Sequence, residues 1–444
     1  MNIEEFIREH REDDVRLLAL QGKRYPDVDM AFALQQIAGW QTARKKIPSW
    51  AAIEGIVYPP HLSMEQCSSE QTARYKAGIV SRCGGTEVRG YEKCDEAHDG
   101  IGFPRRRRPL VLVPSHPRTP APPKKIVDLT GGLGVDFAFL AQAMAPAQSS
   151  VCCGSAAATA TYVEQQPHLC EAARHNFALL GLEHAEVVCA DATDYLHQMP
   201  PAYLIYIDPA RRDTKGARTY AISDCTPNVL EIEQELLDKG EWVLLKLSPM
   251  LDWHKAASEL QHISAIHIVS VQNECKELLL VLADGAMSEA PVVCINLLAD
   301  GTHQRFEYNP ATNARSVNVN AKVNTTYLYE PNASIMKAGC FDEIGNFYQI
   351  CKLSANSHLY VSDHEVKDFP GRGFQIVSIP SMNKRELKEA LRDIDRANIT
   401  VRNFPMSAEA LRKRLRLKDG GDLYIFATTV GDGSHQLFIC RKIV

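Results

Sequence analysis

The sequence predicts an α/β fold whose central sheet is mainly parallel, with a helical segment before it and an α+β module after it. Three observations predict this order. Apolar residues recur at helical spacing over residues 1–80, strand and helix patterns alternate over residues 125–288, and the two patterns mix again over residues 330–444. With 444 residues, the chain has the length of roughly two to four domains.

Composition and charge exclude several classes of protein. The chain has 45% hydrophobic and 23% charged residues, which excludes wholesale disorder. The formal net charge of -5 gives no whole-protein attraction to nucleic acid, so any such binding needs a local basic patch. No apolar run approaches the roughly 20 residues that span a bilayer, so we expect a soluble, cytoplasmic protein with no membrane partner. The 13 cysteines lack C-x-x-C spacing, and we expect free thiols and no metal site.

Two segments are expected before the sheet. Residues 1–80 read as a helical N-terminal domain, with apolar positions such as Phe6, Leu18 and Ile37. Residues 81–124 are polar and rich in proline, as in a linker or mobile loop. Four consecutive arginines at 105–108 favour a solvated basic loop over a phosphate contact.

The central segment, residues 125–288, alternates strands with helices, which favours parallel strands with helices on both faces. Strands are expected at residues 125–129, 160–164, 185–190, 203–207 and 242–247, and helices at residues 136–144, 167–180 and 231–239. Two further apolar runs, 267–271 and 277–282, are joined by too few residues for a helical crossover. They must therefore pair as an antiparallel hairpin that ends the sheet.

The strongest local signal is a glycine-rich turn between the first strand and the first helix of this segment. Asp128 ends the strand, and Thr130, Gly131, Gly132 and Gly134 follow it. Glycines let a backbone approach a ligand, and α/β sheets bind their ligands at the carboxyl ends of strands. A dehydrogenase fingerprint fits poorly, because the third glycine is missing and the sheet ends in a hairpin.

Acidic residues follow the next two strands. Glu164 ends the second strand, where its carboxylate is well placed to accept hydrogen bonds from both hydroxyls of a ribose. Asp191 follows the third strand, where its carboxylate can accept a hydrogen bond from the exocyclic amine of adenine. The motifs therefore indicate a site for a nucleoside cofactor.

In this order, residues 128–134, Glu164, Asp191 and the pair Asp208-Pro209 resemble the successive motifs of class I S-adenosylmethionine-dependent methyltransferases. The resemblance covers roughly residues 125–284. It implies a Rossmann-like methyltransferase sheet with an antiparallel terminal hairpin and S-adenosylmethionine as cofactor.

The fourth strand leads into the residues expected to carry the chemistry. Asp208 and Pro209 fit the loop of enzymes that methylate exocyclic amines, whereas Ala210 and Arg211 depart from it. Methyl transfer is a direct displacement, so orienting the nucleophile is the main task of Asp208. Arg211 either stacks on a base or binds phosphate, or forms an ion pair with a nearby aspartate. Lys246 either faces the same cleft or buries only its stem.

The last hundred residues contain a predicted basic helix at residues 408–417. Arg412, Lys413, Arg414 and Arg416 form either a phosphate-binding face or an ordinary solvated one. Strands are expected at 348–353, 399–402, 424–429 and 436–441, and a further helix at 384–397.

Residues 330–444 resemble the THUMP-like module that accompanies bacterial methyltransferases, preceded by a small ferredoxin-like segment at 289–329. This resemblance implies RNA, such as tRNA or rRNA, as the partner. We therefore expect a methyltransferase acting on a base amine of structured RNA. The alternatives are a methyltransferase of a protein or small molecule, and an RNA-binding protein without catalysis. The sequence leaves the oligomeric state open.

Overall fold

The structure is a computed structural model that describes residues 2–83, 124–144, 159–211, 221–286, 290–311 and 325–443. It divides the chain into two units, residues 1–263 with 280–286, and residues 264–279 with 287–444. Most of the expected linker at residues 81–124, including the four arginines, lies outside the described residues.

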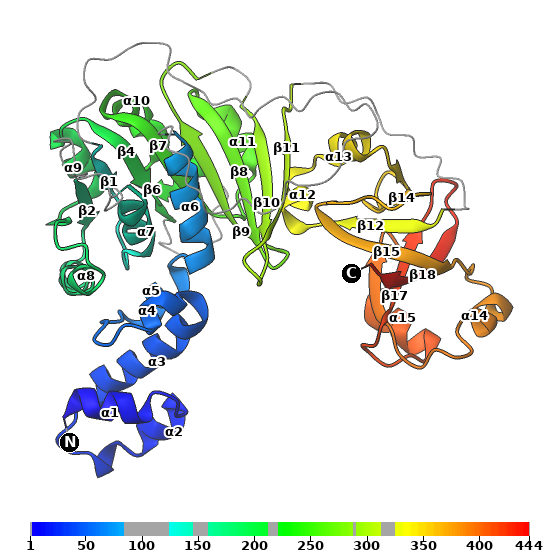
Figure 1. The fold of residues 1–444 in the computed structure, drawn as a ribbon, viewed down its shortest axis with the longest axis horizontal. Coiled ribbons are helices and arrows are strands. Elements are labelled where there is room, and N and C mark those ends of the chain that lie inside the picture. The colour runs from blue at the N-terminus through cyan, green and yellow to red at the C-terminus, as the bar shows by residue number, and fades with distance from the viewer. Residues whose placement is uncertain are drawn as a thin grey trace, which may run out of the picture. The chain divides into compact units, whose positions relative to one another are not determined.

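The N-terminal segment is helical, as predicted (Figure 1). Its elements are α1 (Ile3–His10), α2 (Val15–Leu20), a 3-10 turn (Gly22–Arg24), α3 (Met30–Lys46), α4 (Pro48–Ala51), α5 (His61–Gln66) and α6 (Glu70–Cys83). Asp14 and Asp29 cap α2 and α3, because each carboxylate accepts backbone N–H groups from the first turn. Pro48 begins α4, where its missing N–H removes no helical hydrogen bond.

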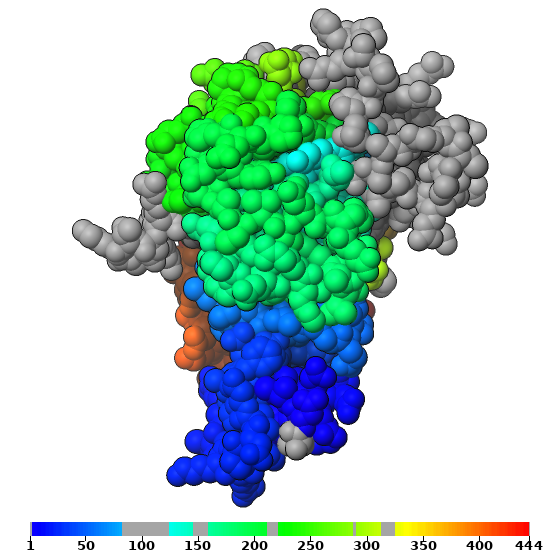
Figure 2. All heavy atoms as spheres, turned by 90° about the vertical axis from the view of Figure 1, so that its left-hand side faces the viewer, coloured from blue at the N-terminus to red at the C-terminus, as the bar shows by residue number. Residues whose placement is uncertain are grey.

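The N-terminal helices share a hydrophobic core with the sheet that follows them. Trp50 and Met64 belong to the same buried cluster as Phe137 and Phe177. The side-chain amide of Asn176 bonds both the N–H and the carbonyl of residue 57, at 2.8 and 2.9 Å. Figure 2 shows the helical segment adjoining the α/β part without a gap. The helices are therefore part of the first unit's core.

The central sheet has nine strands in the order β11-β10-β8-β9-β7-β4-β1-β2-β3. Its strands are β1 (Ile126–Asp128), β2 (Ala160–Glu164), β3 (Glu186–Cys189), β4 (Ala202–Ile207), β7 (Gly240–Leu247), β8 (Ile263–Val271), β9 (Glu274–Leu282), β10 (Val292–Leu297) and β11 (His303–Tyr308). The helices between them are α7 (Val135–Met144), α8 (Pro167–Leu179), α9 (Ala192–Gln198), α10 (Val229–Lys239) and α11 (Trp253–Glu259). Strands β3, β2, β1, β4 and β7 are parallel, as predicted.

The hairpin β8–β9 confirms the predicted antiparallel end of the methyltransferase sheet. Its two connecting residues, Gln272 and Asn273, have φ of +49° and +65°. Two successive residues in the left-handed region form the hairpin turn whose twist matches that of the strands.

The sheet continues beyond this hairpin, which the sequence analysis did not foresee. Strand β10 pairs in parallel with β8, and β11 pairs with β10 in antiparallel fashion. The prediction of a separate small segment at residues 289–329 was therefore wrong for these two strands. Five successive residues of β10 are buried, so both faces of this strand are covered.

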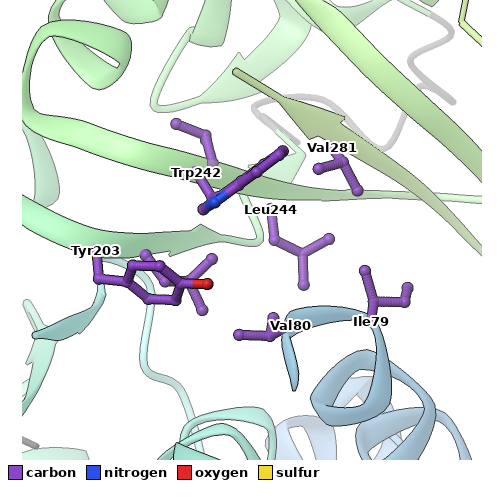
Figure 3. Close-up of a pocket in the computed structure, with 8 residues that line it drawn as sticks. Ile79, Val80, Tyr203, Trp242, Leu244 and Val281 are labelled. Atoms are coloured by element: carbon purple, nitrogen blue, oxygen red, sulfur yellow. The ribbon is translucent and has the colours of Figure 1, made fainter. Parts of the chain in front are cut away.

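Helix α6 packs on the sheet through apolar side chains. Ile79 and Val80 of α6 line a small apolar cavity together with Trp242 and Leu244 of β7 and Val281 of β9 (Figure 3). The residues that line the cavity are aliphatic or aromatic, so it is a packing feature of the first unit. This contact fixes α6 against the strands whose ends carry the candidate site.

The second unit contains a seven-stranded sheet in the order β13-β14-β12-β15-β18-β17-β16. Its strands are β12 (Tyr327–Pro331), β13 (Cys351–Lys352), β14 (Tyr360–Ser362), β15 (Gly371–Ser378), β16 (Asn398–Arg402), β17 (Leu423–Thr429) and β18 (His435–Lys442). Its helices are α12 (Ala333–Ala338), α13 (Phe341–Tyr348), α14 (Lys384–Ala390) and α15 (Ala408–Leu415). Leu387 of α14 and Leu411 of α15 pack on Ile425 and Ile439 of the sheet.

Two predicted elements of this unit were wrong in extent. The strand expected at residues 348–353 is only β13, because α13 runs to Tyr348 and Gln349 caps it with φ of +54°. The helix expected at residues 384–397 ends at Ala390. The N–H of Ala397 instead donates to the carbonyl of Lys418 at 3.0 Å, which draws this segment toward the sheet.

Candidate active site

Four acidic residues lie at the carboxyl ends of the neighbouring strands β3, β2, β1 and β4. Glu164 and Asp128 end β2 and β1, Asp208 directly follows β4, and Asp191 follows β3 by two residues. Because the strands are parallel, these ends meet at one edge of the sheet, which we call the carboxyl edge. The fold thus brings together acids from four separate sequence motifs.

The turn after β1 is shaped by glycines and by one aromatic ring. Gly132 and Gly134 have φ of +55° and +85°, in the left-handed region that favours glycine. A Cβ on Gly131 would lie 2.1 Å from the ring of Tyr162. The hydroxyl of Tyr162 donates to the carbonyl oxygen of Gly132 at 2.5 Å. Gly131 is therefore required by the ring beside it, a reason that the sequence analysis missed.

Replacing Gly131 by alanine is expected to destabilise the protein by roughly 1–3 kcal/mol, the usual cost of overpacking. The added methyl group would force the ring or the turn to move. Urea unfolding measures the change, and Gly78→Ala in α6 is the matched control, because its Cβ would meet no atom within 4 Å. Equal free energies of unfolding for the two variants would contradict this account of the turn.

The backbone holds both acids proposed for the nucleoside. The buried carboxylate of Glu164 accepts the N–H of Gly132 at one oxygen and the N–H of Gln166 at the other, both at 2.9 Å. Each carboxylate oxygen has a second lone pair, so the group can also accept hydroxyls. The exposed Asp191 caps α9, where one oxygen accepts the N–H groups of Thr193 and Asp194.

Asp128 is almost completely buried beneath the turn. Its side chain accepts the N–H of Thr130 at 2.9 Å. Burial raises the pKa of Asp128 well above its usual range, the N–H of Thr130 opposes this, and the carboxylates of Asp136, Asp208 and Glu164 raise the pKa further. A positively charged ligand at this edge would relieve the mutual repulsion of these acids.

Asp208 is held at two points. Its N–H donates to Thr130 Oγ1 at 2.6 Å, which links it to the glycine turn. Its Oδ2 accepts a hydrogen bond from Lys246 Nζ at 2.5 Å. About a third of the Asp208 side chain, 36%, remains exposed, so the group is reachable from solvent. Asp208 is therefore an oriented carboxylate at the carboxyl edge.

The ammonium group of Lys246 lies in the site. The alternative that Lys246 buries only its stem and exposes its ammonium group at the surface was therefore wrong. Its side chain is only 11% exposed, and its Nζ also lies 3.8 Å from Asp136 Oδ2. Asp136, the second residue of α7, forms an ion pair with Lys76 of α6 at 3.0 Å. Neither Lys76 nor Asp136 could be predicted as a site residue, because nothing in their local patterns indicates that α6 reaches this edge.

The structure describes the side chain of Pro209 but not that of Arg211, the other two predicted catalytic residues. Pro209 is buried next to Asp208. The backbone of Arg211 belongs to the short strand β5 (Ala210–Arg211), which pairs with β6 (Cys225–Thr226). The side chain of Arg211 and residues 212–220 lie outside the described part of the chain.

The predicted RNA-binding residues lie on or just after α15 in the second unit. Lys413, Arg414 and Arg416 are exposed, and Lys413 pairs with Glu409 at 2.9 Å on the helix surface. Arg412 differs from them, because it is half-buried and forms an ion pair with Asp419. Arg416 caps the helix with φ of +60°. Three of the four side chains are thus available to a partner.

The order β3-β2-β1-β4-β7-β9-β8, with a glycine turn after β1 and acids at the carboxyl edge, defines a class I methyltransferase. Residues 327–370 match a family described as a ferredoxin-like domain, and residues 371–442 match one described as THUMP domain-like. We expected the ferredoxin-like segment at residues 289–329, but the family match begins at residue 327 and extends to residue 370. The THUMP-like match is shorter than the expected 330–444.

Two relatives are similar to the chain. A solved structure described as a "putative methyltransferase" from Porphyromonas gingivalis W83 is 30% identical, with a TM-score of 0.77, and the match covers 100% of this chain and 98% of that one. An uncharacterized S-adenosylmethionine-dependent methyltransferase from two strains of Mycobacterium tuberculosis is 26% identical over 280 residues, which are 61% of this chain and 72% of that protein.

The chain belongs to the S-adenosylmethionine-dependent methyltransferases that carry a C-terminal THUMP-like domain. Among the residues that the structure describes, none of the helices is both long and apolar enough to cross a membrane. The same residues contain no cluster of three or more His, Cys, Asp or Glu side chains that would hold a metal ion.

Proposed function

We propose that this enzyme methylates a base amine of structured RNA, a tRNA or an rRNA. Asp208 would orient the amine, and the THUMP-like part would bind the RNA. The observation that supports the proposal most is the position of Asp208, which is oriented, partly exposed and at the same sheet edge as Glu164 and Asp128.

The residues at the carboxyl edge fit the methyl donor. Glu164 is a fixed carboxylate with lone pairs for ribose hydroxyls, and Asp191 stands exposed at the next strand end to accept the adenine amine. The surplus of negative charge around Asp128 suits a cationic cofactor. Gly131, Gly132 and Gly134 shape the turn between these acids. When bound, S-adenosylmethionine supplies an electrophilic methyl group on a sulfonium sulfur.

Asp208 would then act on the amine. Its carboxylate accepts a hydrogen bond from an N–H of the base, which directs the nitrogen lone pair toward the methyl donor. After the new N–C bond has formed, the same carboxylate can take up the proton that the nitrogen loses. Because the displacement is direct, this alignment supplies most of the acceleration. Pro209 would keep the following backbone rigid, and Arg211 would contact the base or a phosphate.

The contribution of α15 to RNA binding can be measured directly. Changing Lys413, Arg414 and Arg416 together to Glu is expected to lower RNA affinity more than tenfold at low salt. The slope of the logarithm of the binding constant against the logarithm of the salt concentration should also become shallower by roughly 0.7–0.9 per lost phosphate contact. Filter binding over a salt series gives both quantities. Arg412 is left unchanged, since its ion pair with Asp419 gives it a structural role.

A matched control exists on the neighbouring helix. Lys384, Arg385 and Lys388 of α14 are also exposed, so the corresponding triple Glu variant carries the same change in charge. An equal loss of affinity in both variants would show an unspecific charge effect and contradict a binding face on α15.

The substrate itself is tested with labelled S-adenosylmethionine and total RNA from a strain that lacks the enzyme, followed by digestion to nucleosides. A labelled methylated base is the expected result. Transfer to an RNA-free extract would instead indicate a protein or small-molecule methyltransferase. Cofactor binding without any product would indicate an RNA-binding protein that has lost catalysis.

A further inference from the structure

The ammonium group of Lys246 lies between two carboxylates at the carboxyl edge. Its Nζ is 2.5 Å from Asp208 Oδ2 on one side and 3.8 Å from Asp136 Oδ2 on the other. The side chain is 11% exposed, so few alternative positions are open to it. The attraction of both negative charges holds the ammonium group in this position.

Asp136 is itself fixed by three further groups. Lys76 Nζ lies 3.0 Å from Oδ1, while Ser68 Oγ and Tyr206 Oη donate to Oδ2 at 2.7 and 2.6 Å. Lys76 also donates to Ser68 Oγ at 2.9 Å. The side chain of Lys76 is completely buried. Asp136 therefore cannot follow a displacement of Lys246 and acts as a fixed anchor for it.

We infer that Lys246 is a positioning residue for Asp208, and that Asp136, with Lys76 and Ser68, positions Lys246 in turn. The N-terminal helical segment thereby becomes a structural part of the catalytic centre. This inference rests on the proposed function only for the role of Asp208 in methyl transfer. The chain of contacts runs from α6 through Asp136 and Lys246 to the reacting edge of the sheet.

The charges around Asp208 give this arrangement a measurable signature. Among the described residues, those that face it are Lys246 of β7, Lys76 of α6, Asp136 of α7 and Asp128 of β1. Burial raises the pKa of Asp208, and Lys246 is the strongest opposing influence. Without the ammonium group, Lys76 is the one cation among the described residues that still opposes burial and the two neighbouring acids. The pKa of Asp208 must then rise, and its carboxylate form is lost at a higher pH.

The test compares Lys246→Gln with Lys246→Arg in the full-length protein, by methyl transfer to RNA as a function of pH. We expect Lys246→Gln to lower kcat roughly 10- to 100-fold, the range for a misplaced reacting group. The acid limb of its pH profile should move to higher pH, while KM for RNA stays unchanged. Lys246→Arg keeps the positive charge and should restore much of the rate and the original acid limb.

Lys239→Gln is the matched control. Lys239 is also partly buried in the first unit. Its Nζ lies 3.4 Å from Glu235 Oε1, and the residue is not part of the contacts around Asp208. It should leave the rate and the acid limb unchanged. An acid limb that does not move in a folded Lys246→Gln variant would overturn the inference, since a merely structural lysine would lower the amount of active enzyme without changing its pH profile.

A second readout is independent of the substrate. With ¹³Cγ-labelled aspartate, the Asp208 resonance is assigned from its loss in Asp208→Asn and titrated in wild type and in Lys246→Gln. A higher titration midpoint in Lys246→Gln supports the inference even if no RNA is methylated. An unchanged midpoint contradicts it whatever the substrate proves to be. The failure of the proposed function and the failure of this inference are thus distinguishable.

Discussion

Replacing Asp208 by alanine is expected to slow methyl transfer severely while S-adenosylmethionine still binds. The carboxylate lies beside the nucleoside acids and accepts a hydrogen bond from Lys246, whereas the bond to Thr130 is made by the backbone N–H, which alanine keeps. Its loss should therefore leave Glu164 and the glycine turn in place. Loss of an orienting and proton-accepting group corresponds to a rate reduction of roughly 100- to 10,000-fold. The measurement is single-turnover transfer from labelled cofactor at saturating RNA.

Calorimetry with S-adenosylhomocysteine is the companion experiment. An unchanged affinity would place the defect in the transfer step, whereas a large loss of affinity would mean that Asp208 belongs to the cofactor site. Asp208→Asn is the matched variant, because it keeps the size of the side chain and one acceptor oxygen. It should retain more activity than Asp208→Ala. Wild-type turnover in Asp208→Ala would remove Asp208 from the mechanism.

The largest expected effect on stability follows from Lys76. This side chain is completely buried and pairs with Asp136, so Lys76→Met would leave a buried carboxylate without its nearest cation. Removing one partner of a buried ion pair costs roughly 3–5 kcal/mol. Urea unfolding of the two proteins at neutral pH measures the difference. The loss in free energy of unfolding should be larger for Lys76→Met than for Arg74→Met on the same helix, since the partly exposed Arg74–Glu70 pair is screened by solvent.

The pH dependence of this difference has a definite sign. Burial alone would raise the pKa of Asp136, but Lys76, Lys246 and two hydroxyl groups lower it from 3.8 to about 2. Stability from the carboxylate is therefore fully present above pH 3.8 and is lost as the pH falls toward 2. The difference between wild type and Lys76→Met should shrink in this window. A double variant with Asp136→Asn should recover part of the loss at neutral pH, and the absence of any recovery would contradict the pairing.

The sequence predicted the central sheet well because its signals are local. Each strand predicted between residues 125 and 282 is a short apolar run, and the acids stand where the strands end. The short helices α9 and α11 were not predicted. The order of those motifs along the chain was enough to place Asp128, Glu164 and Asp208 at one edge. The hairpin followed from the length of its connection alone.

What the sequence could not provide depends on contacts between distant segments. Lys76 looks like an ordinary helix lysine until α6 packs on α7, and Asp136 looks like a first-turn acid that stabilises the helix dipole. The place of β10 in the sheet was missed because an apolar run can pair with several other strands. Its own residues do not indicate that the neighbour is β8. Likewise, Gly131 was read as leaving room for a ligand, whereas the ring of Tyr162 fills that space.

The parallel pairing of β10 with β8 has a practical consequence for dissecting the protein. A fragment cut at residue 288, the boundary that the sequence suggested, would remove the strand that pairs with residues 266–271 of β8. Six successive residues of its backbone would then be left without their partners in β10. Bare edges of this kind recruit other chains and promote aggregation. Truncations intended to isolate the catalytic half should therefore retain residues 290–311.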